Sequence, residues 1–300
     1  MNQSGPFLVA ASYDLSISVT DISMCTSSAP IKFGLQNAQA NKIIGLPSNR
    51  FAVASNPFIF IYNRTAKTNK PGQSYQGHQT NVTDLCTDGS KLYSCSEDET
   101  WRVWDFSQPR AVATYQTGCC LNTITLINEN KWVVTGNDNG KVEVWEADTG
   151  KLILSERFSP KAIRSIVPSN NGNIIVIGCQ DGNAVIADVT AEGIKELRRV
   201  NAHPNAFITR VAASKDGRLF ATASSDSTAK IWNFEDCSLV NVLEDQSQTK
   251  WIWDVAFTND CKLICTGGTD KVCRIWDVET GTLKKQIEWH QKGVTCIAII

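Results

Sequence analysis

Histidine, a hydroxyl residue, aspartate and tryptophan occur together twice along the 300-residue sequence, in the same order each time. The two sets are His78, Ser94, Asp98 and Trp104, and His203, Thr222, Asp226 and Trp232. A hydroxyl beside a histidine that an aspartate orients is the arrangement that activates a nucleophile in hydrolases. The same side chains can also satisfy one another as a buried hydrogen-bond relay that performs no reaction. The elements that position the residues decide between the two interpretations.

Both sets follow a repeat that runs through the chain. Asp, four residues, an apolar residue and Trp-Asp return in better and worse copies about every 41 to 45 residues. The clearest copies run from Asp98 to Asp105, from Asp226 to Asn233 and from Asp270 to Asp277, and degenerate copies end at Asp21, Asn63 and Asp188. Such a period with a Trp-Asp ending is typical of WD repeats, each of which forms one four-stranded propeller blade.

The sequence therefore predicts an all-β fold, a seven-bladed WD-repeat β-propeller closed by strands from both termini. Residues 7–20 read as the second and third strands of a blade, and residues 290–300 read as the innermost strand that this blade lacks. Pairing the two ends removes an open sheet edge. A single domain is expected over residues 1–300, with blades at about 7–33 plus 290–300, 34–74, 75–117, 118–158, 159–200, 201–245 and 246–289.

Because the two histidine sets recur in register with the blades, we interpret them as structural hydrogen-bond relays. We therefore expect no catalytic residue, and the sequence shows no phosphate loop, metal cluster or cofactor site. Blade one has a partial set, in which His290 and Asp14 are accompanied by Ala10 and Thr20 in the places of the hydroxyl residue and the tryptophan. This predicts an incomplete relay in blade one. Blade seven lacks the preceding histidine altogether.

The composition excludes several classes of function. A formal net charge of −1 and a pI near 6.3 leave no basic field that would attract nucleic acid or an anionic membrane. Eleven cysteines without a CxxC pair, most of them in strand-like runs, predict reduced thiols and a cytoplasmic location. The first residues lack a charged region followed by a long apolar stretch, and no apolar run reaches membrane-spanning length. The sequence thus predicts neither a signal peptide nor a transmembrane segment.

A propeller offers partners the mouth of its central channel, which is lined by the first residues of each innermost strand and by those before each turn aspartate. Alternation along the strand Trp251-Ile252-Trp253 puts both indoles on one side and Ile252 in the core. Clustered aromatic side chains with an arginine are typical of an interface hot spot. The predicted partner-binding residues are Trp251, Trp253, Phe207, Tyr13, Arg164, Asn122 and Asn81. Alternatively, the aromatic residues plug the channel or pack between blades.

The chain also resembles one particular group of WD-repeat proteins. The stretch 251–257, the phrase 270–276, the turn 278–281 and His290-Gln291-Lys292 are similar to the last blade of the small WD-repeat subunit of target-of-rapamycin kinase complexes. This is the G-protein-beta-like, "lethal with sec-thirteen" family. The opening 11–14 and the run 221–226 resemble it as well. The resemblance covers nearly the whole chain and is weakest in blades two and five.

The resemblance implies a non-catalytic scaffold in growth and nutrient signalling. Its channel face would dock on an insertion in the C-terminal lobe of a target-of-rapamycin-type kinase and stabilise the kinase domain. Other subunits of the complex are further implied partners, and endomembranes are surfaces that the protein would reach through the complex. Tyr13, Trp251 and Trp253 match the family pattern at this face. Blade two departs from it, because Ala40 and Lys42 are expected at the channel mouth, where polar amide residues would match the family.

A second class of function is a WD-repeat adaptor of another assembly, such as a ubiquitin-ligase substrate receptor or a G-protein beta subunit. A beta subunit should begin with a long helix for coiled-coil pairing, whereas this chain enters a strand by Phe7. A ligase receptor usually carries an additional adaptor-binding segment, which the sequence does not show. A propeller hydrolase, the third alternative, needs an exposed nucleophile or metal ligands at the channel. The predicted mouth residues supply neither.

Overall fold

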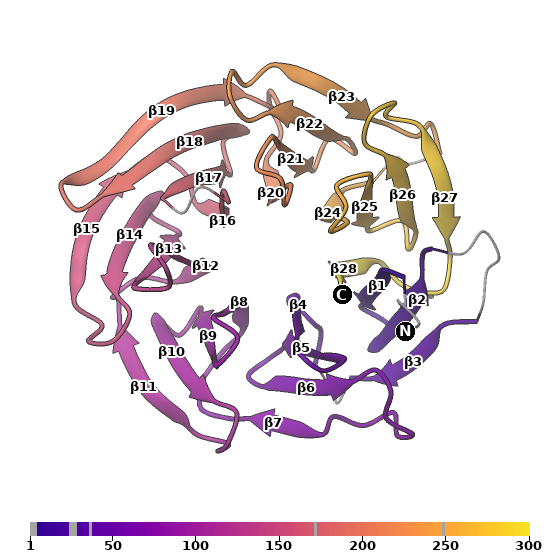
Figure 1. Ribbon diagram of the computed structural model, residues 1–300, viewed down its shortest axis with the longest axis horizontal. Helices are drawn as coiled ribbons and strands as arrows, with labels where there is room; N and C mark the ends of the chain where they lie inside the picture. The colour runs from indigo at the N-terminus through magenta and orange to yellow at the C-terminus, as the bar shows by residue number, and fades with distance from the viewer. Residues whose placement is uncertain (1–4, 24–28, 36–37, 171–172, 248–249) are drawn as a thin grey trace.

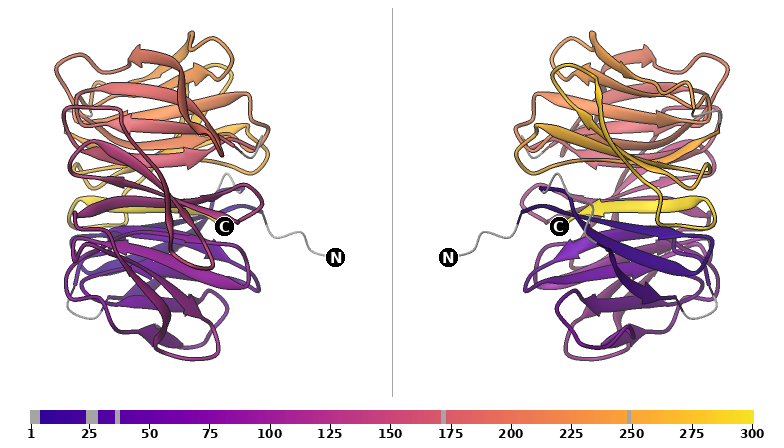
Figure 2. Two further views of the ribbon diagram at one scale, coloured as in Figure 1. Left: turned by 90° about the vertical axis from the view of Figure 1, so that its left-hand side faces the viewer. Right: turned by 90° about the vertical axis from the view of Figure 1, so that its right-hand side faces the viewer.

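The computed structural model describes residues 5–23, 29–35, 38–170, 173–247 and 250–300, and within these ranges the chain forms 28 β-strands. The strands make seven four-stranded sheets that stand as blades around a central channel (Figure 1). Seen from the side, the blades form a disc (Figure 2). The predicted fold class, an all-β seven-bladed propeller, is confirmed. No helix in the described residues is long and apolar enough to cross a membrane.

Every blade is an antiparallel sheet whose first strand faces the channel. Blade one contains β28 (Val294–Ile299), β1 (Phe7–Ser12), β2 (Ser16–Asp21) and β3 (Ile31–Gly34); blade two β4 (Lys42–Leu46), β5 (Arg50–Ala54), β6 (Ile59–Asn63) and β7 (Gln73–Tyr75); and blade three β8 (Val82–Thr87), β9 (Lys91–Ser96), β10 (Thr100–Asp105) and β11 (Ala111–Gln116). Blade four contains β12 (Leu121–Ile127), β13 (Trp132–Asn137), β14 (Lys141–Glu146) and β15 (Leu152–Arg157); and blade five β16 (Ile163–Pro168), β17 (Ile174–Cys179), β18 (Asn183–Thr190) and β19 (Gly193–Asn201). Blade six contains β20 (Ile208–Ala213), β21 (Leu219–Ser224), β22 (Ala229–Asn233) and β23 (Leu239–Leu243); and blade seven β24 (Ile252–Phe257), β25 (Leu263–Gly268), β26 (Cys273–Asp277) and β27 (Leu283–Ile287).

Blade one is completed by strands from the two ends of the chain, as predicted. Strand β28 pairs antiparallel with β1, and Leu8 lies opposite Ile299. Beyond the strand ends, the backbone N–H of Phe7 donates to the carbonyl of Ile300 at 3.0 Å, and the N–H of Ile300 donates back to Phe7 at 3.0 Å. The two ends of the chain are therefore joined by main-chain hydrogen bonds within blade one, so β1 is not left with an unpaired edge.

The hydrophobic core lies between the blades rather than inside any one of them. Seven apolar clusters occur among the described residues, one at each seam between neighbouring blades. At the seam of blades five and six, for example, Val176 and Ile186 pack against Phe220 and Trp232. Because the middle strands are covered on both faces, they read as nearly continuous apolar runs instead of alternating ones.

A small residue at one equivalent position of each blade lets the next blade approach. It lies in the strand next to the innermost one. The residues are Ala11, Ala54, Cys95, Gly136, Gly178, Ala223 and Gly267. Their partners in the innermost strands are, in the same order, Cys296, Lys42, Asp84, Thr123, Ser165, Arg210 and Asp254. A Cβ on Gly178 would stand only 2.8 Å from Val211 and 2.9 Å from Ile208 of the next blade. Real Cβ atoms do not come so close, so the seams require a small side chain at this position.

Candidate functional site

One cavity at the end of the central channel brings together all seven residues predicted to bind a partner. Its volume is about 420 Å³, and we call it the channel-mouth cavity. Its lining includes Tyr13, Asn81, Asn122, Arg164, Phe207, Trp251 and Trp253. These side chains come from six different blades, so they meet only when the ring is closed.

The aromatic residues of the cavity are braced against one another. Ile252 is fully buried in the seam between blades six and seven, and the flanking indoles of Trp251 and Trp253 line the cavity. The Trp251 ring meets Phe207 edge-on with 4.9 Å between ring centroids, and it meets Trp253 in the same way at 5.4 Å. Edge-to-face contacts of this kind hold aromatic rings in place. Trp251 is nevertheless 41% exposed and Tyr13 is 39% exposed, so both present apolar surface to solvent.

The polar residues of the cavity differ in how far they are already engaged. The side-chain amide of Asn81 donates to the Glu97 carboxylate at 3.0 Å. The amide of Asn122 donates to the Asp138 carboxylate at 2.8 Å and to the Ile163 carbonyl of the next blade at 3.1 Å. By contrast, the half-buried guanidinium of Arg164 makes no hydrogen bond or ion pair to any residue in the described ranges. Arg164 thus offers an unpaired positive charge at the mouth.

The structure corrects the expected mouth residues of blade two by one position. Ala40 lines the cavity as expected, but the side chains on either side of it, Gln39 and Asn41, line it as well, whereas Lys42 pairs with Ala54 and lies one layer below the mouth. The side-chain amide of Asn41 donates to the carbonyl of Val82 in blade three at 2.9 Å. The prediction failed because Ile43 and Ile44 are both β-branched and apolar, so their pattern did not show which of them faces the core. With the corrected register, blade two does present two amide residues, as the family resemblance requires.

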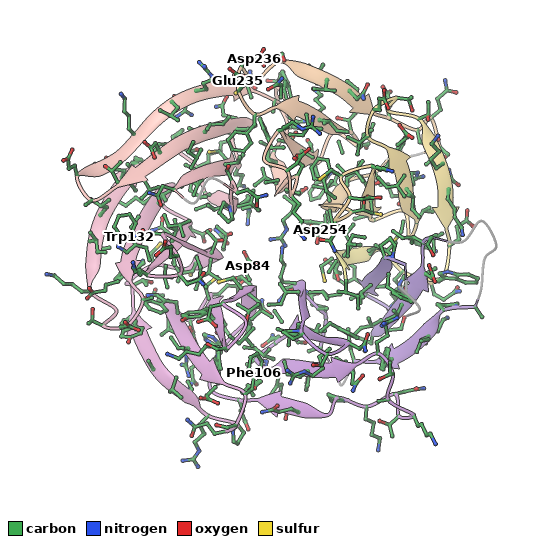
Figure 3. The ribbon with its side chains drawn as sticks, viewed as in Figure 1. Asp84, Phe106, Trp132, Glu235, Asp236 and Asp254 are labelled. Atoms are coloured by element: carbon green, nitrogen blue, oxygen red, sulfur yellow. The ribbon has the colours of Figure 1, made fainter. Side chains whose placement is uncertain are left out.

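Four charged side chains close the channel beneath the cavity, and the sequence analysis missed them. Arg210 of β20 extends from blade six, and its guanidinium donates to the Asn41 carbonyl of blade two at 3.3 Å. It lies 3.4 Å from Asp254 and 3.9 Å from Asp84, and Lys42 lies 3.9 Å from Asp84. The labelled Asp84 and Asp254 flank the central channel in Figure 3. Arg210 therefore connects four blades across the axis and forms the floor of the channel-mouth cavity.

In this cluster of buried charges, two cationic side chains face two carboxylates. Arg210 is 8% exposed, and Asp84 and Asp254 are 3% and 1% exposed. Burial acts to lower the pKa of Arg210, but the charges of Asp254 and Asp84 outweigh it and raise that pKa. The Asp84 carboxylate also accepts a hydrogen bond from the Thr123 hydroxyl at 2.8 Å. Buried ions persist only with such partners, so removing one member leaves the others uncompensated.

In blade three, the histidine set forms a closed hydrogen-bond relay. The ring nitrogen Nδ1 of His78 lies 2.8 Å from the Asp98 carboxylate, and Nε2 lies 2.7 Å from the Ser94 hydroxyl. The Trp104 indole N–H donates to the same hydroxyl at 2.8 Å. Ser94 is fully buried, so no substrate reaches its oxygen in this geometry. Asp98, His78 and Ser94 are connected to one another as in a hydrolase triad. The Ser94 oxygen, however, accepts the Trp104 indole N–H instead of facing a cleft.

Blade six repeats the arrangement with a threonine. Nδ1 of His203 lies 2.7 Å from Asp226, and Nε2 lies 2.8 Å from the Thr222 hydroxyl. The Trp232 indole donates to Thr222 at 3.0 Å. Burial acts to raise the pKa of Asp226, but the hydrogen bonds and charge of His203 and the hydrogen bond from Thr228 outweigh it and hold that pKa well below the usual value. The carboxylate therefore stays ionised and accepts hydrogen bonds on both oxygens.

Blades one and seven form the corresponding buried hydrogen bonds with other residues. In blade one, Nε2 of His290 lies 2.9 Å from the hydroxyl of Ser18, so a neighbouring strand supplies the hydroxyl that Ala10 lacks. Blade one therefore has the hydroxyl that was expected to be missing, whereas Thr20 still occupies the place of the tryptophan. In blade seven, where no histidine is present, the buried Arg274 donates to Asp245 at 2.8 Å and to Asp270 at 2.7 Å. Within the described ranges, no group of His, Cys, Asp or Glu side chains is arranged to hold a metal ion.

Comparison with known proteins decides the family. Residues 69–105, 194–233 and 237–277 match the family described as "WD domain, G-beta repeat". The chain is 32% identical over 284 residues to "Target of rapamycin complex subunit LST8" of Bos taurus, covering 88% of this chain and 86% of that protein. The chain belongs to the LST8 family. LST8-family relatives with 27% identity include "Target of rapamycin complex subunit wat1" of Schizosaccharomyces pombe, over 248 residues, 79% of this chain and 77% of that protein. Another is "Target of rapamycin complex subunit LST8-1" of Arabidopsis thaliana, at 27% identity over 252 residues, 81% of this chain and 82% of that protein.

Proposed function

We propose that this chain is a non-catalytic WD-repeat scaffold subunit of a target-of-rapamycin kinase complex. Its channel-mouth cavity docks on the C-terminal lobe of the kinase domain and stabilises that domain. Membership of the LST8 family supports the kind of assembly, because the relatives are named as target of rapamycin complex subunits. The observation that carries the docking face is the exposed Trp251, braced by Phe207 and Trp253, in a cavity that also contains the unpaired Arg164.

The physics of the cavity fits a protein partner. An indole held rigid by its neighbours loses little conformational entropy on binding, so covering it yields most of its hydrophobic stabilisation. Truncation of such a central aromatic residue commonly costs about 2 kcal/mol or more of binding free energy. Arg164 supplies five N–H donors for a carboxylate or for backbone carbonyls of the partner. The interface would then combine an apolar centre with one charged anchor.

A scaffold role, rather than hydrolysis, is supported by the two histidine relays. Ser94 and Thr222 are fully buried, and each hydroxyl accepts a hydrogen bond from a tryptophan indole. A nucleophile needs access to the substrate and an oxygen that is free to attack. We therefore assign both relays to the stability of their blades.

A cytoplasmic location, with endomembranes reached through the complex, is supported by the thiols. Ten cysteines in the described residues are free. Burial raises the pKa of Cys179 to about 12, so its thiol behaves as a small apolar group rather than as a nucleophile. Unpaired thiols in strands are typical of proteins from reducing compartments.

The proposed function is tested by affinity capture from native cytosol with wild-type chain and the variant Trp251→Ala/Trp253→Ala. We expect wild type to retain a large kinase of the target-of-rapamycin type and the folded double variant to lose it. A matched control is Leu152→Ala, which removes an equally exposed apolar side chain (43%) from β15 on the outside of blade four. Near-ultraviolet circular dichroism checks that all variants fold.

The other outcomes contradict particular parts of the proposal. If the kinase stays bound to the double variant, the docking face is wrong. If wild type captures no such kinase, the kinase-complex role is wrong, and the adaptor of another assembly replaces it.

A further inference from the structure

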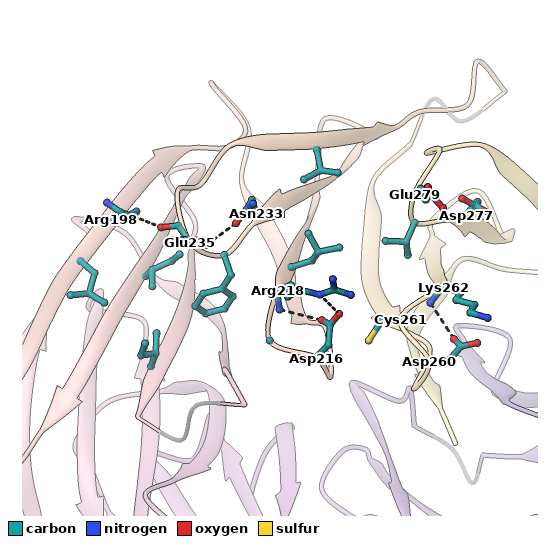
Figure 4. A pocket seen from close by; sticks show the side chains of 18 residues that line it. Arg198, Asp216, Arg218, Asn233, Glu235, Asp260, Cys261, Lys262, Asp277 and Glu279 are labelled. Carbon is teal, nitrogen blue, oxygen red and sulfur yellow. Dashed lines mark hydrogen bonds and ion pairs between the residues drawn. The ribbon is translucent and has the colours of Figure 1, made fainter.

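A second cavity lies away from the channel mouth. It is a groove of about 1190 Å³ across blades five, six and seven, which we call the blade-six groove (Figure 4). It is bounded by the loops before β21 and β25 and the loops after β22 and β26. Strand β21 begins at the groove with Leu219 and ends at Ser224, next to Phe207 of the channel mouth. Six residues of strand rise about 20 Å, so the two sites lie on opposite faces of the disc.

The groove contains apolar surface that the fold does not cover. Leu197 of β19 is 43% exposed and Val240 of β23 is 41% exposed, and both line the groove. Phe234 lies at the seam between blades five and six and is 9% exposed. Large apolar side chains gathered in a concave surface are typical of binding sites rather than of open protein surface.

Two of the carboxylates that line the groove have no hydrogen-bond donor among the described residues. The lining has five acidic and three basic side chains, an excess of two negative charges. Arg218 donates to Asp216 at 2.7 Å, and Arg198 donates to the backbone carbonyl of Glu235 at 2.5 Å, as the dashed lines of Figure 4 show. The side-chain carboxylates of Glu235 and Glu279 accept no hydrogen bond from any residue of the described ranges. The negative electrostatic potential of these two carboxylates favours the binding of a positively charged group.

Shape and charge together indicate the occupant. At about 1190 Å³ the groove exceeds the roughly 300 to 1,000 Å³ of small-molecule sites, and it extends across three blades. An extended polypeptide follows such a surface and places alternate side chains into it. We propose that the blade-six groove binds an extended segment of a partner protein. An aliphatic side chain of that segment packs between Leu197 and Val240, and a flanking Lys or Arg pairs with Glu235 or Glu279.

The test selects peptides from a random phage-displayed library on the full-length wild-type chain. Synthetic peptides of the enriched sequence are then measured by fluorescence polarisation. We expect an aliphatic residue flanked by Lys or Arg, with affinity that falls as salt rises. Val240→Asp and the double variant Glu235→Lys/Glu279→Lys should each weaken binding at least tenfold.

The matched controls keep the assignment specific. Val242→Asp changes a residue of the same strand that is equally exposed, at 40%, but does not line the groove. Glu244→Lys reverses an exposed charge outside the groove. Both controls, and Trp251→Ala/Trp253→Ala at the channel mouth, should bind the peptides like wild type. Absence of an enriched sequence, enrichment of acidic peptides, or equal loss in the controls would each overturn the proposal, whatever the kinase capture shows.

Discussion

At the scale of single residues, the relays stabilise the blades through ionised aspartates. Burial acts to raise the pKa of Asp98, but the hydrogen bonds from His78 and Thr100 outweigh it and hold that pKa far below its ordinary value. Burial lowers the pKa of His78, against the opposing effect of Asp98. Both shifts mean that the folded protein binds fewer protons than the unfolded chain, so acid favours unfolding.

We predict that the free energy of unfolding falls in two stages on acidification. The first begins near pH 6.5, where the unfolded histidine gains a proton, and the second begins near pH 4, where the unfolded aspartate gains a proton while the carboxylate of Asp98 stays ionised in the folded chain. Asp98→Asn should cost about 1 to 3 kcal/mol at pH 7, because buried donors lose a charged acceptor, and it should flatten the second stage. Urea unfolding from pH 7 to pH 3 measures both effects. The control Glu129→Gln alters a side chain that is 84% exposed, and identical profiles for Asp98→Asn and wild type would contradict the prediction.

The relay residues could be predicted because one repeat contains them all at fixed spacing. The role of Ser18 could not be predicted. Ser18 lies in β2 opposite Ala10 of β1, and its hydroxyl replaces the one that the repeat would place at position 10. The amide pair Gln39 and Asn41 was missed for a related reason, since the apolar pattern of β4 allows two registers. Spacing therefore predicts a residue's place in the repeat, whereas strand pairing decides which neighbour it meets.

At the scale of the strands, the seams depend on the small residue that faces the next blade. We predict that Gly178→Ala destabilises the protein by about 1 to 3 kcal/mol, because its Cβ overlaps Val211 and Ile208 in a closely packed seam. Gly193→Ala is the matched control, since a Cβ there meets no atom within 4 Å, and it should change stability by less than about 0.5 kcal/mol. Thermal unfolding of the two variants measures the difference. Equal melting temperatures would show that the seam adapts to the added methyl group.

The number and order of the strands were predictable from the turn residues and the Trp-Asp phrase. The small-residue position was not, because no single blade explains why Gly178, Ala223 and Gly267 should be alike. The reason lies in the neighbouring blade, whose innermost strand fills the space. A contact between repeats leaves a sequence signal only after the repeats have been aligned in register.

At the scale of the whole molecule, Arg210 connects blades two, three, six and seven across the channel. We predict that Arg210→Met costs about 3 to 5 kcal/mol, because Asp84 and Asp254 remain buried without a countercharge. Adding Asp84→Asn and Asp254→Asn should recover part of this loss. Arg164→Met is the matched control, since Arg164 has no partner among the described residues and should change stability little. Urea unfolding at neutral pH measures the free energy of unfolding of Arg210→Met, of the triple variant and of the Arg164→Met control. A loss in Arg164→Met as large as in Arg210→Met would contradict the prediction.

No spacing rule could have revealed this cluster. Arg210 and Asp84 lie three blades apart in sequence and meet only because the ring closes. A weak signal was nevertheless present, because charged residues recur just inside the mouth position of the innermost strands, at Lys42, Asp84, Arg210 and Asp254. Charges at an inward-facing position need partners, and the opposite side of the channel is where they are found.

The pairing of Phe7 with Ile300 means that the order of the blades along the chain can be changed by circular permutation. Because these residues exchange both backbone hydrogen bonds, a short linker can join them without moving either strand. New ends can then be opened in the exposed loop 64–70 between β6 and β7, which leaves every blade with its four strands. Such a circular permutant keeps every seam and the charges on the axis. The blades have an order around the circle, but the circle has no privileged starting point.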